Sequence, residues 1–206
     1  MLDFYERLFD PATVRHEEVA GDAGLRSGRM LLLFRNGRFG AEQDTAIWHV
    51  GWGNTVLGDT YLAHASRDVA WEPPLPAEQI HLHLLSEDPL KAAGWYRDRL
   101  DASVEVMPTL AKQIEPRPEL RVADAIVRFG PFALVIYRAA PPFASTRGQR
   151  IDHFALSGDE LDSTLTRLRA ASVRVLVPPA PFINAARAAI IEGPDGVAIE
   201  LIERRN

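Results

Sequence analysis

The strongest constraint on the fold is a pattern that occurs twice along the chain, with a period of about 72 residues. In each copy an alternating, strand-like run comes first, an amphipathic helical segment follows, and three further strand-like runs complete the pattern. The two opening runs contain His81 and His153. The repeat is one of pattern rather than of residue identity. It predicts two modules, each built from a strand, a helix and three strands.

Two proline-containing connectors bound these copies and predict the domain organisation. The first connector lies at residues 71–76, and the second begins at residue 140. We therefore expect an N-terminal extension over residues 1–75, module one over residues 79–139 and module two over residues 150–204. Within the extension, the patterns predict a short helix at residues 3–9, strands at residues 30–34, 46–52 and 61–64, and a turn at residues 36–37.

The last strand-like run carries a carboxylate among apolar residues. Side chains alternate along a strand, so Val197, Ile199 and Leu201 share one face and Glu200 lies on the other. An ionised carboxylate without a partner in apolar surroundings costs several kcal/mol. Glu200 therefore predicts a bound cation. The same alternation places His81 and His153 opposite the apolar, helix-packing residues of their own strands.

Helix signals follow both opening strands. Asp88 is expected to cap the first helix, with Pro89 at its first position. The segment Ser157–Glu160 has the spacing of a capping box before the second helix.

Composition narrows the classes of partner. The chain of 206 residues has 23 basic and 28 acidic residues, a net charge of −5 and no long run of one sign, so neither nucleic acid nor an anionic membrane surface is an expected partner. The expected partner is a small molecule. The absence of cysteine leaves histidines and carboxylates as the expected metal ligands. No apolar run reaches the roughly 18 to 20 residues of a membrane span, and the N-terminus lacks a secretion signal, so we expect a cytoplasmic protein.

Three motifs carry a family resemblance. They are His-Leu-His-Leu-Leu-Ser-Glu-Asp-Pro at 81–89, Ile-Asp-His-Phe-Ala-Leu at 151–156 and Gly-Pro-Asp-Gly-Val-Ala-Ile-Glu-Leu at 193–201. Together the paired motifs resemble the vicinal oxygen chelate superfamily, which includes glyoxalase I, extradiol dioxygenases and the fosfomycin and bleomycin resistance proteins. The resemblance implies an α+β fold in which two βαβββ modules form an incompletely closed eight-stranded sheet. Residues 48–53 resemble another opening strand, so the extension is a candidate degenerate module, lid or dimerisation arm.

The resemblance also implies a site. Its metal ligands would be His81, His153 and Glu200. Two imidazoles and one carboxylate suit Fe(II), and Mn(II), Zn(II), Ni(II) and Co(II) also accept these ligands. His83, on the face of His81, is a candidate to replace His81 as ligand, to hydrogen-bond and orient a ligand, or to act as a base, and Tyr137 is a second catalytic candidate. The candidate substrate-binding residues are Arg128, Arg187 and His49.

Two departures from the family pattern bear on the reaction. Val135 stands where a glyoxalase-type site takes a fourth ligand, and Ile190 stands where extradiol dioxygenases usually have a tyrosine. We expect a metal-dependent, dioxygenase-like enzyme acting on a small oxygen-rich or aromatic substrate, with a homodimer as one expected assembly. The alternatives are a lyase or isomerase of glyoxalase type and a metal-free protein that binds a drug or metabolite. Retention of the three ligands favours an enzyme.

Overall fold

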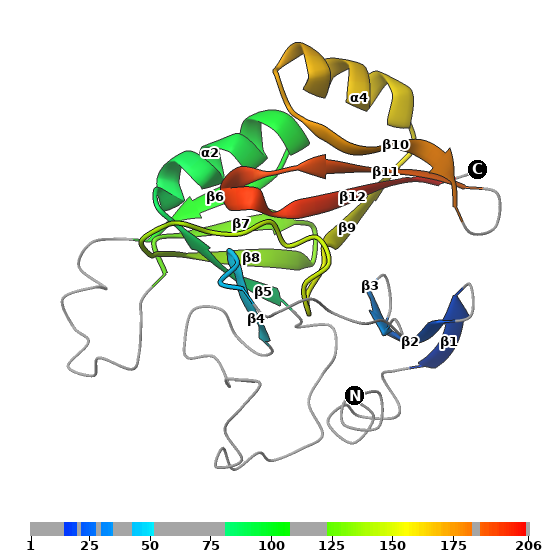
Figure 1. Ribbon diagram of the computed structural model, residues 1–206, viewed down its shortest axis with the longest axis horizontal. Helices are drawn as coiled ribbons and strands as arrows, with labels where there is room; N and C mark the ends of the chain where they lie inside the picture. Colours follow the sequence, from blue (N-terminus) through cyan, green and yellow to red (C-terminus); the bar gives the residue numbers. More distant parts are fainter. Residues whose placement is uncertain are drawn as a thin grey trace.

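A computed structural model describes residues 15–19, 22–27, 30–34, 43–51, 81–107, 123–182 and 186–204. Within these ranges the chain is mostly strand, with two α-helices, and its strands lie in three sheets that do not close (Figure 1). The order of a strand, a helix and three strands occurs twice. The predicted α+β class and the paired βαβββ modules are therefore confirmed.

Both modules are built from short strands rich in branched apolar residues, the composition typical of half-buried strands. The elements of module one are β5 (His81–Ser86), α2 (Pro89–Leu100), β6 (Ser103–Val106), β7 (Ala125–Phe129) and β8 (Phe132–Arg138). Those of module two are β9 (Phe154–Gly158), α4 (Leu161–Ala170), β10 (Val175–Pro181), β11 (Arg187–Glu192), the 3-10 turn η3 (Pro194–Gly196) and β12 (Ala198–Glu203).

The N-terminal extension contributes two separate pieces. The strands β1 (Arg15–Val19), β2 (Asp22–Ser27) and β3 (Met30–Phe34) form an antiparallel sheet of their own. The strand β4 (Ile47–Gly51) instead pairs with β5 of module one. The predicted helix at 3–9, turn at 36–37, strand at 61–64 and connector at 71–76 lie outside the described residues.

The module strands lie in two sheets, which refines the single eight-stranded sheet that the resemblance implied. Their orders are β4-β5-β8-β7-β6 and β10-β11-β12-β9. The antiparallel strand β4 occupies the outer edge of β5, so module one gains a fifth strand from the extension. The sheets therefore meet through side chains rather than through a shared row of backbone hydrogen bonds.

One apolar core holds the two modules together. Tyr96 of α2 is 1% exposed and lies 6.4 Å, ring to ring, from Phe154 of β9. The same core includes the helix-facing residues of both sheets, among them Leu82, Leu84, Leu134, Ile136, Leu165, Leu168, Ile199 and Leu201. Burial of this apolar area is the main favourable term in folding. Because both sheets turn their helix-packing faces to this core, their opposite faces, which bear His81, His83 and Glu200, lie away from it.

The two helices begin differently. In α2 the side chain of Asp88 accepts a hydrogen bond from the N–H of Lys91 at 3.2 Å, as predicted. The predicted capping box of α4 is wrong, because Ser157 lies in strand β9, paired with Ile202, instead of at a helix start. The N–H of Leu161 donates to Glu203 of β12 at 3.3 Å.

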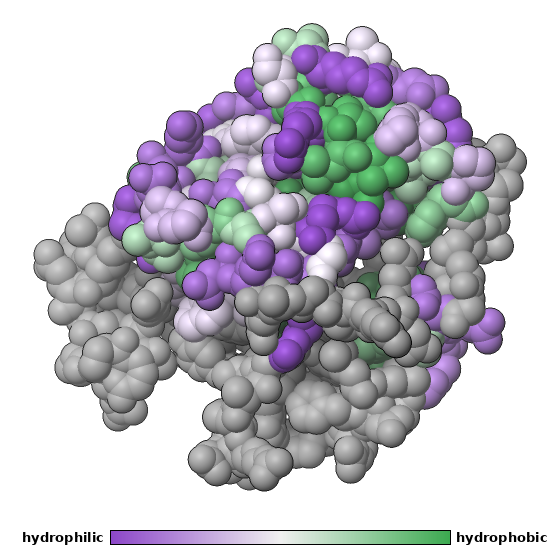
Figure 2. Space-filling model, in the orientation of Figure 1, coloured by the Kyte–Doolittle hydropathy of each residue, from purple (hydrophilic) through white to green (hydrophobic). Residues whose placement is uncertain are grey.

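The surface carries both polar and apolar regions. Figure 2 shows hydrophobic residues gathered below helix α4, over strands β10 and β11, with hydrophilic residues around them. In the part of the chain that the structure describes, no helix has both the length and the apolar character needed to cross a membrane.

Candidate metal centre

Glu200 lies in the middle of β12, on the face away from the shared core, and is 8% exposed. The turn η3 fixes where this strand begins. Gly196 has φ +75°, a conformation that favours glycine, and a Cβ there would lie 3.3 Å from the backbone of Ala144. Since the turn sets the first residue of β12, it also sets the face on which Glu200 lies.

His153 lies beside this carboxylate. It immediately precedes β9, which runs parallel to β12 with Ala155 opposite Glu200. The distance from His153 Nε2 to Glu200 Oε2 is 3.4 Å. Two of the predicted ligands, far apart in the sequence, are therefore neighbours in the fold.

Asp152 holds the other side of the imidazole. Its Oδ1 lies 2.6 Å from His153 Nδ1, and its second oxygen accepts a hydrogen bond from the N–H of Gly148 at 2.5 Å. Arg147 also pairs with Asp152. A carboxylate on Nδ1 orients a histidine so that Nε2 faces a metal, which is common behind metal-ligating histidines.

Thr146 ties this loop to the last strand. Its side chain is fully buried, and its hydroxyl donates to the carbonyl of Asp152 at 2.7 Å while it accepts from the N–H of Ala198 at 2.9 Å. The loop that carries Asp152 and His153 is therefore fixed to the start of the strand that carries Glu200.

The two carboxylates determine the protonation of His153. Burial by itself lowers the pKa of His153, but hydrogen bonds to Asp152 and Glu200 and the charges of both groups outweigh it and raise the pKa to about 9. At neutral pH, without a metal, both ring nitrogens of His153 are therefore protonated, and the positively charged imidazole lies between two carboxylates. The two carboxylates thus favour a positive charge at this position.

A second cluster lies on module one. His81 and His83 are 1% and 0% exposed, and their ring centroids are 4.8 Å apart. The ring of Tyr137 stacks on His83 at 5.4 Å with an interplanar angle of 13°. The ring of Trp48 lies edge to face with the rings of His83 and Tyr137, at centroid distances of 6.4 Å and 5.9 Å. Four of the aromatic side chains of module one and β4 thus gather on the face away from the shared core.

The pairing of β4 with β5 explains why Trp48 reaches this cluster. Ile47 pairs with Leu84, and the next paired residue is His49, whose backbone lies opposite His83. Trp48 is the extra residue of a β-bulge, an irregularity that places two residues of one strand opposite one residue of its partner. The predicted site residue His49 is thus a cross-strand neighbour of His83.

The two predicted arginines have different surroundings. Arg128 lies opposite Ala133, which is itself paired with His81, so Arg128 shares the face of His81 two strands away and forms a 3.9 Å ion pair with Glu105. Arg187 pairs with Glu203 across β11 and β12, on the face opposite Glu200.

Arg187 is held by two acids on that face. Its guanidinium lies 2.9 Å from Glu203 and 2.8 Å from Asp162 of α4. This arrangement ties α4 to the sheet, and the role of Arg187 toward a substrate stays a prediction.

The predicted ligands fall into two groups. His153 and Glu200 are together, whereas His81 lies with His83 and Tyr137 in the other sheet. Among the side chains that the structure describes, no group of three histidine, aspartate or glutamate residues is placed to hold a metal ion. The complete set of His81, His153 and Glu200 stays a prediction.

Sequence reasoning missed Asp152, Thr146 and Trp48 as site residues. Strict alternation places neighbours on opposite faces, so an acid adjacent to His153 gave no signal. The backbone at 152 is not yet in β9, which begins at Phe154, so alternation does not apply there. Nothing in the alternation of residues 46–52 marks Trp48, and only the bulge places it beside His83.

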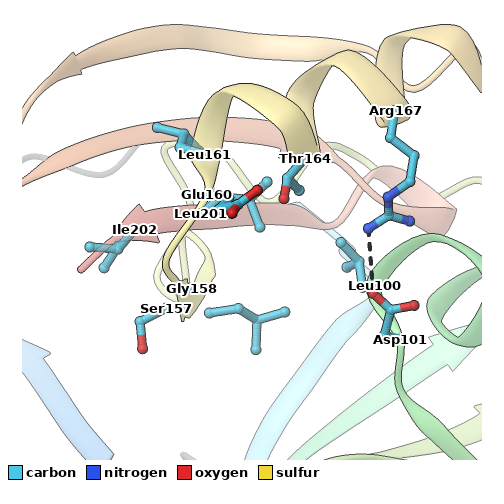
Figure 3. Close-up of a pocket in the computed structure, with 11 residues that line it drawn as sticks. Leu100, Asp101, Ser157, Gly158, Glu160, Leu161, Thr164, Arg167, Leu201 and Ile202 are labelled. Atoms are coloured by element: carbon cyan, nitrogen blue, oxygen red, sulfur yellow. Dashed lines mark hydrogen bonds and ion pairs between the residues drawn. The ribbon is translucent and has the colours of Figure 1, made fainter. Parts of the chain in front are cut away.

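A cleft of about 150 Å³, partly open to solvent, lies elsewhere, between α4 and the end of α2 (Figure 3). At its rim Arg167 reaches Asp101 at 3.4 Å. Its lining comprises Leu100, Asp101, Leu156, Ser157, Gly158, Glu160, Leu161, Thr164, Arg167, Leu201 and Ile202. None of the predicted site residues lines this cleft.

Paired βαβββ modules and a histidine next to a carboxylate on the last strand define the class. A family model described as Glyoxalase/Bleomycin resistance protein/Dioxygenase superfamily matches residues 79–201, more than half of the chain. The chain belongs to this superfamily, the vicinal oxygen chelate group. A sequence comparison with curated proteins gives no match.

Solved structures similar to this chain include several superfamily members. The fosfomycin resistance protein FosX of Listeria monocytogenes is 14% identical, with a TM-score of 0.45, over 61% of this chain and 91% of that one. Lactoylglutathione lyase of Agrobacterium tumefaciens is 19% identical, with a TM-score of 0.41, over 60% and 90%. A superfamily member from Sphaerobacter thermophilus is 16% identical, with a TM-score of 0.43, over 60% and 94%.

Proposed function

We propose that this chain is a divalent-metal-dependent enzyme that acts on a small oxygen-rich or aromatic molecule with dioxygenase-like chemistry. The observation that carries the proposal is the pair of His153 and Glu200, with Asp152 on the far nitrogen of the imidazole. Fe(II), Mn(II), Zn(II), Ni(II) and Co(II) all accept an imidazole nitrogen and a carboxylate oxygen as ligands. Members of the superfamily generally use divalent metals, which agrees with this donor set.

The charge around His153 also fits a divalent cation. Asp152 and Glu200 place two carboxylates around one imidazole, and in the metal-free chain a proton on that imidazole balances part of their charge. A metal held by Nε2 of His153 and the carboxylate of Glu200 would replace the Nε2 proton. Asp152 would keep the proton on Nδ1, because the hydrogen bond there is undisturbed.

A bound divalent metal would act as a Lewis acid toward two neighbouring oxygen atoms of a substrate. The chain supplies the orientation and the environment. Asp152 and Thr146 fix the imidazole, and Ile190 lies opposite Glu200 in the pairing of β11 with β12 and is 7% exposed. This apolar neighbour limits water at the carboxylate, which strengthens electrostatic interactions there.

The position of Val135 favours dioxygenase-like chemistry over a lyase or isomerase of glyoxalase type. Val135 is fully buried and packs in a small apolar cluster with Ala123 and Tyr137. No ligand can come from this position, where a glyoxalase-type site would take its fourth. The catalytic roles of His83 and Tyr137 and the substrate-binding roles of Arg128, Arg187 and His49 stay predictions.

A metal-free binding protein is the second candidate. The observation in its favour is that the described side chains bring only two of the three predicted ligands together. In this case the pair of His153 and Glu200 is a structural ion pair, and its loss changes stability without changing metal content.

Metal analysis of the full chain, purified without chelator, separates the two candidates. We expect Glu200→Gln and His153→Ala each to lower the metal content by about one ion per chain, since each removes one of two adjacent ligands. His16→Ala, which replaces an exposed histidine of β1, is the matched control and should leave the content unchanged. Equal metal content in the parent and in both variants would refute the metal centre. Iron with substrate-dependent O₂ uptake supports the dioxygenase-like reaction, and zinc or nickel without O₂ uptake contradicts it.

A further inference from the structure

The cleft between α4 and the C-terminal end of α2 lies where the two modules meet (Figure 3). Module one contributes Leu100, the last residue of α2. Module two contributes Leu156 of β9, Leu161 of α4 and Leu201 of β12. Leu161 and Leu201 are 4% and 7% exposed, so the floor of the cleft is apolar. The contact between two domains is a common place for a small-molecule site.

A glycine leaves this cleft open. Gly158 lies in β9, and alternation places it on the face of Phe154 and Leu156, which belong to or pack on the shared core. A Cβ at Gly158 would meet no atom of the described residues within 4 Å. The sheet therefore lacks a side chain at the point where the cleft reaches it. The space of about 150 Å³ has the size of an apolar cavity that accepts one benzene-sized ring, and it is too small for a segment of a protein partner.

The polar groups of the lining favour a ligand that donates a hydrogen bond. Figure 3 shows the hydroxyl of Thr164 directed from α4 towards the cleft. The hydroxyls of Ser163 and Thr166 instead donate to carbonyls of the helix segment itself, at 3.2 Å and 2.8 Å. Glu160 adds a carboxylate to the lining. Both a hydroxyl and a carboxylate accept hydrogen bonds, so a ligand hydroxyl has partners here.

The charges of the lining disfavour an anion. Two acids, Asp101 and Glu160, and one base, Arg167, line the cleft. The guanidinium of Arg167 lies 3.4 Å from the carboxylate of Asp101 and donates to the carbonyl of Arg99 at 2.8 Å. Its charge is thus matched by Asp101, and the lining as a whole carries one more acid than base. A negatively charged ligand would be repelled, whereas an uncharged one would not.

We propose that this cleft binds a compact, uncharged molecule made of one ring and one hydroxyl group, with the size and chemistry of phenol. The ring fills the space above Gly158 between the leucines of the two modules, and the hydroxyl bonds to Thr164 or Glu160. Leu201 and Glu200 are neighbours in β12 and lie on opposite faces. The site is therefore separate from the candidate metal centre, and it does not depend on the function proposed for His153 and Glu200.

Titration of the full chain with phenol, followed by the backbone amide signals of isotope-labelled protein in NMR spectra, tests the site. We expect saturable shifts at Leu161 and Thr164, with a dissociation constant on the order of 1 mM for so small a ligand. Benzoate, which has the same ring and a negative charge, should bind more weakly than phenol. Gly158→Leu places a side chain in the cleft and should abolish the shifts. Thr164→Val should weaken phenol binding by about 3 to 10-fold, the value of one hydrogen bond.

Thr166→Val is the matched control, because it removes a hydroxyl of the same helix that bonds to the helix itself, and it should bind phenol as the parent does. Signals far from the cleft report whether Gly158→Leu is folded. Shifts that persist in folded Gly158→Leu, the absence of saturable shifts in the parent, or benzoate binding as tight as that of phenol would each overturn the proposal. If Gly158→Leu does not fold, equal phenol affinity in Thr164→Val and Thr166→Val overturns it. A parent dimer that Gly158→Leu dissociates, without phenol shifts, would show that a second copy occupies the cleft instead.

Discussion

At the scale of single residues, Asp152 is the group that orients the imidazole of His153. Its carboxylate forms a hydrogen bond with Nδ1 of His153. The same carboxylate accepts a hydrogen bond from the N–H of Gly148 and forms an ion pair with Arg147. Thr146 then fixes the carbonyl of the same residue. One aspartate thus connects a surface loop to the histidine.

Replacing Asp152 by asparagine should affect both metal binding and pH dependence. We expect metal affinity at the centre to fall by about 10 to 100-fold, the usual cost of losing such a partner. In the metal-free protein the pKa of His153 should fall from about 9 toward its ordinary 6.5, because an attractive negative charge is lost.

The sign of the stability effect follows from that raised pKa. Protonated His153 stabilises the fold fully below about pH 6.5, and this contribution disappears as the pH rises through about 9. The difference in melting temperature between parent and Asp152→Asn, measured with chelator present, should therefore shrink between these two values. Asp159→Asn, at an exposed aspartate, is the control and should show no such trend. A difference that grows with pH would contradict this assignment of charge.

At the scale of elements, helix α4 depends on its sheet for its first hydrogen bond. Glu160 occupies the N-cap position without a capping bond from its side chain, and Glu203 of β12 accepts from Leu161 instead. Glu203 also holds Arg187, which reaches Asp162 of the helix. One carboxylate therefore joins the helix, β11 and β12.

Glu203→Ala should lower the free energy of unfolding by about 1 kcal/mol, the usual value of a helix cap. Glu160→Ala, at the nominal cap position, should cost less than about 0.5 kcal/mol, the usual range for surface substitutions. Urea unfolding of the two variants measures the difference. The reverse order of the two effects would show that α4 is capped locally.

At the scale of the whole molecule, the joint between the modules is a cluster of aromatic rings. The ring centroid of Tyr96 in α2 lies 6.2 Å from that of Phe129 and 6.4 Å from that of Phe154. Among the described residues its hydroxyl has no hydrogen-bond partner, and burial, with the nearby charge of Asp195, raises its pKa well above the ordinary value. A helix of one module thus inserts a tyrosine into the core that it shares with the other.

Tyr96→Phe should leave stability unchanged or raise it by up to about 1 kcal/mol, because the buried hydroxyl loses its desolvation cost and the ring remains. Tyr96→Ala should cost about 3 to 5 kcal/mol, since it leaves a cavity between the modules. Thermal or urea unfolding measures both. A loss of more than about 1 kcal/mol in Tyr96→Phe would mean that the hydroxyl makes a bond that holds the modules together.

Local rules were sufficient for most elements and for the faces of their residues. Alternation correctly separated Glu200 from Ile199 and Leu201, and the helix signal at Asp88 is present in the structure. The same rules failed at Ser157, where a helix-start signal lies inside a strand because pairing with β12 extends β9. Short patterns describe what a segment prefers, and a neighbouring strand can override that preference.

By itself the sequence determined the superfamily, through the resemblance that its three motifs carry. It also determined the repeated βαβββ order and which side of each strand carries polar chemistry, because these follow from periodicity within a few residues. Only the tertiary structure decided which polar side chains meet. His153 joins Glu200 because β9 and β12 run side by side, and Tyr137 joins His83 because β8 runs beside β5. Contacts between residues distant in the chain depend on strand pairing and core packing, which no local spacing encodes.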